Sequence, residues 1–82
     1  MVQCDVRISA GNCTKLCRAR IDADFWHGGN VPVEFAGFLE LPKPERETLA
    51  VSDRLVLILQ ESGEPYRMIL DPFTGRFVAR QL

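Results

Sequence analysis

The C-terminal third of the chain has the clearest hydrophobic pattern, with three apolar runs separated by two short turn-like segments. Residues 55–59 are apolar throughout, whereas the next two runs alternate apolar and polar residues with the period of a half-buried strand. The separating segments, ESGEP and DPFTG, contain the glycine and proline that tight turns favour. The pattern predicts a three-strand antiparallel meander, with residues 55–59 in a central strand because both of its faces are apolar. The residues expected to face the core from the other two strands are Tyr66, Met68, Leu70, Phe77 and Ala79.

Residues 31–41 also alternate, and Pro32 indicates that the strand they form starts there or lies at an edge. Gly37 in its middle predicts a bulge or bend that lets a small sheet curl towards closure. The two prolines of LPKPE end this strand. For the segment RETLAVSDRL, residues 46–55, we favour a short strand that leads into the central one, with a helical turn capped near Pro44 as the alternative.

Residues 13–25 alternate apolar and charged side chains, which predicts a strand that pairs with residues 2–8 in a hairpin. The same segment also fits an amphipathic helix, so a helix at about 12–25 is the alternative. In the hairpin, an even-length loop at SAGN or GN buries more apolar surface than an odd one. It places one set of residues on the inner face: Cys4, Val6, Ile8, Cys13, Cys17, Ala19 and Ile21. Lys15 shares this face, and its long stem can carry the ammonium out to water.

These elements predict a single domain, residues 1–82, that is mainly β: a small antiparallel sheet or partly closed barrel of five to six short strands. The alternative is an α+β fold in which the helix at about 12–25 packs on the sheet. In 82 residues the core is small, so a second subunit would add stability.

Composition and charge argue against several classes of protein. The apolar share of 46% and charged share of 26% are typical of a globular protein, and no apolar run approaches the roughly 20 residues of a membrane span. The N-terminus lacks the pattern of a secretory signal, and an odd number of cysteines favours a reducing compartment. We therefore expect a cytoplasmic protein without membrane contact. A net charge of −1 removes the general attraction to nucleic acid that a basic domain would have.

The three cysteines, all within residues 4–17, are interpreted as small core residues. Their C-x8-C-x3-C-x9-H spacing with His27 lacks the close pairs of common zinc sites, and no C-x-x-C redox motif is present. In one register Cys4 would face Cys17 and could form a strained disulfide on oxidation. We expect no metal and no cofactor.

The segment DADFWHGGN, residues 22–30, contains the only tryptophan and the only histidine. Trp26 is a residue type that often anchors interfaces, and His27 could carry protons near neutral pH. A simpler interpretation is that the aromatics close the core while the glycines turn the chain. Because no nucleophile or general acid can be assigned to His27, we expect no catalytic residues and no enzyme.

Arginines supply eight of the ten basic residues, and several lie near aromatic side chains in the predicted strands. The candidate binding residues are Trp26, His27, Arg18, Arg20, Arg67, Phe73, Arg76 and Arg80. Single-stranded nucleic acid could stack on such a surface, but the neighbouring acids dilute its charge, so this function is the alternative. We favour a small non-catalytic binding or assembly module that acts through self-association or contact with another protein. An open edge at residues 2–9 or 76–82 could pair with a second copy.

Overall fold

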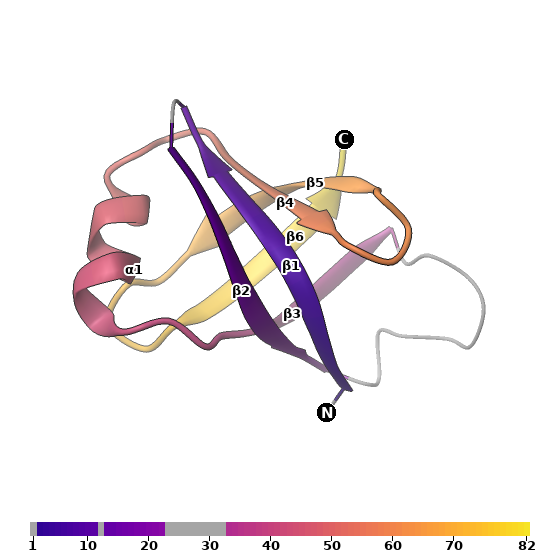
Figure 1. Cartoon of the computed structure of the whole chain (residues 1–82), viewed down its shortest axis with the longest axis horizontal. Coiled ribbons are helices and arrows are strands. Elements are labelled where there is room, and N and C mark those ends of the chain that lie inside the picture. The colour runs from indigo at the N-terminus through magenta and orange to yellow at the C-terminus, as the bar shows by residue number, and fades with distance from the viewer. Residues whose placement is uncertain (1, 12, 23–32) are drawn as a thin grey trace.

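The computed structural model describes residues 2–11, 13–22 and 33–82. Six antiparallel strands close into a barrel in the order β1-β2-β3-β6-β5-β4, and one helix lies at an end of it (Figure 1). The elements are β1 (Val2–Ala10), β2 (Cys13–Ile21), β3 (Glu34–Leu39), α1 (Lys43–Ala50), β4 (Leu55–Leu59), β5 (Pro65–Leu70) and β6 (Arg76–Gln81). The mainly β prediction is therefore confirmed, including the C-terminal meander β4-β5-β6.

Closure of the barrel comes from β1, which pairs with β2 on one side and over Val6–Ala10 with β4 on the other. The β6 strand lies between β3 and β5. Neither β1 nor β6 is an outermost strand of a sheet, so the predicted open edge is wrong for β6 and for residues 6–10 of β1, whereas residues 2–4 of β1 pair with β2 alone. The helix predicted as an alternative at about 12–25 is also wrong over the described part of that range, because Cys13–Ile21 form β2.

The inner faces predicted from the alternation are confirmed. Tyr66, Met68, Leu70, Phe77 and Ala79 are all buried, together with the three leucines of β4. Phe35 of β3 is fully buried at the centre of an aromatic cluster. Its ring centroid lies 4.7 Å from that of Tyr66 and 6.0 Å from that of Phe77, both edge to face. This geometry is favourable for aromatic pairs and fixes β3 against β5 and β6.

Gly37 permits the close approach of β3 to β2. A Cβ atom at this position would overlap the carbonyl oxygen of Arg20, so only glycine fits. The register runs without interruption from Ala19 opposite Leu39 to Ile21 opposite Gly37. Gly37 is therefore not a bulge, and it helps the sheet to close by letting two backbones come together.

The β1–β2 hairpin has the even loop that was predicted, because Ala10 lies opposite Cys13 and two residues join the strands. Gly11 adopts a φ of 62°, which suits a tight hairpin turn. The prediction that all three thiols are core residues is wrong: Cys4 and Cys17 are half-buried, and Cys13 is exposed at the hairpin end. Cys13 lies beyond the part of β2 that pairs with β3, so no third strand covers it.

Residues 43–50 form helix α1, so the short strand favoured within residues 46–55 is wrong and the helical alternative is correct in type. Pro44 lies in the first turn, where its missing N–H has no intrahelical partner to lose, and Glu45 complements the helix dipole there. Leu49 points into the core and is fully buried. No helix in the described residues is long and apolar enough to cross a membrane.

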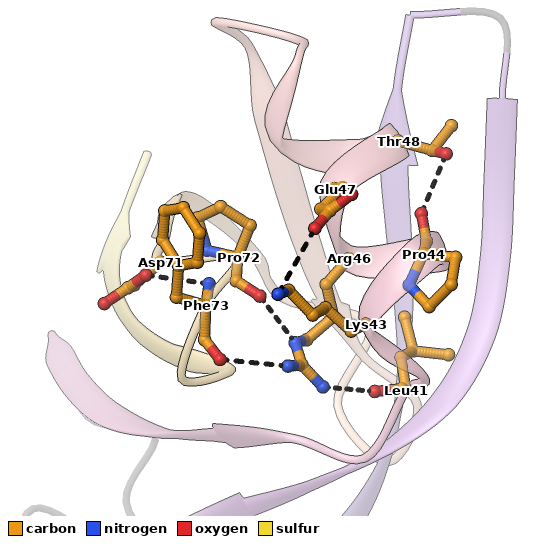
Figure 2. A network of polar contacts seen from close by, with 9 residues as sticks. All are labelled: Leu41, Lys43, Pro44, Arg46, Glu47, Thr48, Asp71, Pro72 and Phe73. Carbon is orange, nitrogen blue, oxygen red and sulfur yellow. Dashed lines mark hydrogen bonds and ion pairs between the residues drawn. The ribbon is translucent and has the colours of Figure 1, made fainter.

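Arg46 joins the helix to two other parts of the chain (Figure 2). Its guanidinium donates hydrogen bonds to the carbonyl oxygens of Leu41 (2.7 Å), Pro72 (3.0 Å) and Phe73 (3.2 Å). A planar guanidinium can satisfy three divergent acceptors in this way, whereas an ammonium cannot keep the same geometry. Arg46 therefore has a structural role, holding α1 against the turn between β5 and β6.

Candidate functional site

The outer face of β3, β6 and β5 carries a row of apolar side chains. Ala36 of β3 lies opposite Val78 of β6, which lies opposite Ile69 of β5. Ile69 is 76% exposed and Val78 is 42% exposed. Directly opposed residues on one face of a sheet are in side-chain contact, so these three form a continuous strip, which we call the apolar row. An outward position on a half-buried strand is ordinarily polar, so the row is a departure from the pattern.

An arginine and an aromatic ring border the apolar row on one side. Phe38 lies opposite Arg76 on β6 and opposite Arg20 on β2. The guanidinium carbon of Arg76 lies 5.0 Å from the centroid of the Phe38 ring, in cation–π geometry. Arg20 is instead held by Glu40, with its Nε 2.7 Å from a carboxylate oxygen, and this hydrogen bond lowers the pKa of Glu40.

Two further arginines border the row on the other side. Arg80 lies opposite Arg67 on β5 and Glu34 on β3, and its Nη2 is 3.4 Å from a carboxylate oxygen of Glu34. Within the described parts of the chain, neither Arg67 nor Arg76 has a carboxylate at ion-pair distance. These two cations are therefore available to an external group.

A hollow of about 350 Å³ lies over this face, with a floor that includes the apolar row and Phe38. The charged residues that line it are Asp22, Asp71 and Arg76. The carboxylate of Asp71 accepts hydrogen bonds from the Phe73 N–H (2.9 Å) and the Thr74 hydroxyl (3.0 Å), and these bonds lower its pKa. Asp71 thus stabilises its own turn and keeps its charge at the rim of the hollow.

The structure brings together four of the predicted binding residues, Arg20, Arg67, Arg76 and Arg80, on this one face. The other two predicted binding residues in the described part of the chain lie away from this face. Arg18 extends from another part of β2 towards Asp5, at 3.6 Å, and Phe73 lies in the β5–β6 turn with the Lys43 ammonium 5.3 Å from its ring centroid. Trp26 and His27 lie outside the described residues.

The apolar members of the site, Ala36, Phe38, Ile69 and Val78, were not predicted as binding residues. Their signal was present in the alternation, because they occupy the positions between the buried residues of their strands. What the alternation did not give was their proximity, because Ala36 and Val78 are neighbours only through the register of β3 with β6.

The half-buried thiols are weak nucleophiles near neutral pH, because few of them are in the thiolate form. Burial, assisted by Glu61 and Asp5, raises the pKa of Cys4 from 9.0 to about 11. Burial, assisted by Glu45 and Glu40, raises the pKa of Cys17 to about 11 as well. The thiolate is the reactive form, so both residues lack the activation expected of a nucleophile or redox centre. Across residues 2–11, 13–22 and 33–82, no group of three or more His, Cys, Asp or Glu side chains is arranged to hold a metal ion.

These shifts predict the pH dependence of alkylation in a Cys13→Ser protein, where only Cys4 and Cys17 remain. In the native state both should react with iodoacetamide about a hundredfold more slowly at pH 8 than in denaturant, because their thiolate fraction falls by that factor. The native rate should keep rising with pH until about pH 11. Mass spectrometry of timed samples measures both rates, and a plateau near pH 9 would contradict the assignment.

The described residues thus form a small closed antiparallel β-barrel with an arginine-bordered apolar strip on its outer surface. Comparison with protein families, curated proteins and solved structures found no match for the chain.

Proposed function

We propose that the protein is a non-catalytic binding or assembly module, and that the outer face of β3, β6 and β5 contacts another protein. The observation that carries this proposal is the apolar row, in which Val78 and Ile69 are exposed and Ala36 is half-buried, beside Phe38 and Arg76. Exposed apolar side chains that adjoin one another mark interaction surfaces more often than single ones do. Interface centres are also enriched in aromatic residues and arginine.

The charges on this face favour a partner segment of particular chemistry. Arg67 and Arg76 lie on opposite sides of the apolar row and are the arginines of this face without a carboxylate partner in the described residues. A segment with one or two apolar side chains over the row and acidic side chains beside them would satisfy both arginines. The module would then act as an adaptor for acidic, apolar-anchored segments.

The test is selection of peptide ligands from a displayed random library, followed by calorimetric measurement of their affinity for variants. Ile69→Glu places a carboxylate in the apolar row, and because Ile69 is largely exposed the barrel should fold normally. We expect this change to weaken the selected ligands at least tenfold, which corresponds to about 1.4 kcal/mol. Val51→Glu, at an apolar residue after α1 that is 86% exposed, is the matched control and should leave the affinity unchanged. Ligands that bind Ile69→Glu as tightly as the original chain would contradict the proposal.

Binding of single-stranded nucleic acid is the second candidate, and the Phe38–Arg76 pair favours it. An aromatic ring beside an arginine is a common platform for base stacking. Against it, Arg20 and Arg80 are engaged by Glu40 and Glu34, so the face carries nearly balanced charge. Fluorescence anisotropy with a labelled oligonucleotide separates the two functions, since nucleic-acid binding should weaken steeply as salt is added.

A further inference from the structure

Among the described strands, β2 has the longest stretch with a neighbouring strand on one side only. β2 pairs with β1 along all nine residues from Cys13 to Ile21, but with β3 only over Ala19–Ile21. The Arg18 carbonyl oxygen still accepts a bond of 2.9 Å from the Glu40 N–H. Residues 13–17 therefore have a neighbouring strand on one side only, and in Figure 1 this part of the hairpin extends past the end of β3.

The free backbone groups on this edge belong to Thr14 and Leu16. The carbonyl of Arg18 points away from β1, towards Glu40, and along a strand every second residue directs its N–H and C=O to the same side. Thr14 and Leu16 consequently direct theirs away from β1 as well. Within the described parts of the chain, these groups have no hydrogen-bond partner, and both side chains are exposed, Leu16 by 70%.

We propose that a second copy of the chain pairs with this edge, β2 against β2, antiparallel about a two-fold axis at Lys15. In this register Thr14 of each copy lies opposite Leu16 of the other, and each such pair exchanges two hydrogen bonds. The four bonds use the N–H and C=O groups of Thr14 and Leu16 on each edge, and each edge supplies equal numbers of donors and acceptors, which is why a second copy fits. Isologous pairing of this kind gives a closed two-fold dimer.

An alternative register centred on Leu16 is less favourable. It would place Thr14 opposite Arg18, whose carbonyl oxygen is already engaged by Glu40. The Lys15 register pairs only residues 13–17, which lie before the part of β2 that pairs with β3. The length of the edge therefore selects the register.

The side chains are compatible with the Lys15 register. It brings the two Lys15 residues together on the inner side of the sheet, and each has its own countercharge, because the Glu45 carboxylate lies 3.7 Å from its ammonium. Helix α1 reaches β2 through this inner-side contact, whereas the outward-facing Thr14 and Leu16 are exposed. Leu16 of one copy lies diagonally across from Leu16 of the other, which covers part of an exposed apolar side chain on each.

The same register explains the spacing of CTKLC, residues 13–17, which is symmetric about Lys15. It places Cys13 of one copy opposite Cys17 of the other, as a non-hydrogen-bonded pair with a Cα separation of about 4.5 Å. That separation lies within the range of disulfides, whereas within one chain the two cysteines are about 13 Å apart along the strand. A disulfide between Cys13 and Cys17 would therefore identify the register, although the backbone hydrogen bonds alone determine it.

The first test is the oligomeric state by size-exclusion chromatography with light scattering over a concentration series. The original chain should reach twice its 9.3 kDa mass as concentration rises. Thr14→Pro removes one edge N–H and leaves the ladder with β1 intact, so it should weaken dimerisation at least tenfold while circular dichroism is unchanged. Thr14→Val keeps the N–H and should dimerise like the original chain. A monomer at every concentration up to about millimolar, or equal dimerisation by Thr14→Pro, would overturn the proposal.

The second test fixes the register by cross-linking in a Cys4→Ser background. Molecular oxygen with a copper–phenanthroline catalyst accepts two electrons and two protons from each pair of thiols that becomes a disulfide. Peptide mapping should find Cys13 joined to Cys17 between chains, and Cys13→Ser should abolish the covalent dimer. A product joined only through two Cys13 residues would overturn the register. This proposal uses a different surface from the apolar row, so Ile69→Glu should leave dimerisation unchanged.

Discussion

Replacing Gly37 by alanine should lower the free energy of unfolding by about 3 kcal/mol, a large part of the stability of a chain this small. The added methyl group would overlap the Arg20 carbonyl oxygen and crowd the backbone of Ile21. Because the obstructing atoms are backbone, no side-chain rotation can relieve the overlap, and β2 and β3 must separate. Urea unfolding followed by circular dichroism measures the change.

Gly63→Ala is the matched control for this substitution. Gly63 has a positive φ of 73°, but an added Cβ there has nothing within 4 Å. Its replacement should cost about 1 kcal/mol from backbone strain alone. The difference between the two variants isolates the overlap at the β2–β3 contact. Equal destabilisation by both would show that β2 and β3 do not need this close approach.

Sequence periodicity predicted which residues face the core because a strand exposes and buries alternate side chains, and each misplacement would bury a charge. The even hairpin loop followed from the same reasoning on Val6, Ile8, Ala19 and Ile21. Helix α1 was not predicted as the favoured element, since Leu49 and Val51 in a short segment also fit alternation. The prolines at positions 42 and 44 were interpreted as a break, although Pro44 lies within the first helical turn.

The pairing of strands that lie far apart in the sequence could not be predicted. Closure requires β1 to pair with β4, with Ala10 opposite Leu55, and no local pattern links positions so distant. The candidate site has the same origin, because Phe38 meets Arg76 only through the β3–β6 register. The arginines were identifiable by type, but the carboxylates that engage Arg20 and Arg80 were not. The free edge of β2 likewise exists only because β3 is shorter.

Replacing Phe35 by alanine should lower the free energy of unfolding more than replacing Gly37 does. Phe35 is fully buried and packs edge to face against Tyr66 and Phe77, so its removal leaves a cavity at the centre of the barrel. Truncation of a buried phenylalanine to alanine lowers the free energy of unfolding by about 4 kcal/mol, and this value includes the loss of the aromatic contacts. Thermal and urea unfolding measure the loss.

Phe35→Leu provides a second measurement in case the alanine variant does not fold, and it should cost about half as much because most of the volume is retained. Phe73→Ala is the control, since Phe73 is 74% exposed and its removal should change the stability by less than about 0.5 kcal/mol. Because Phe35 also fixes the strand that carries Ala36 and Phe38, the leucine variant should bind the selected peptide ligands more weakly as β3 loosens. Stability losses of similar size for Phe35→Leu and Phe73→Ala would contradict a core built on the Phe35 ring.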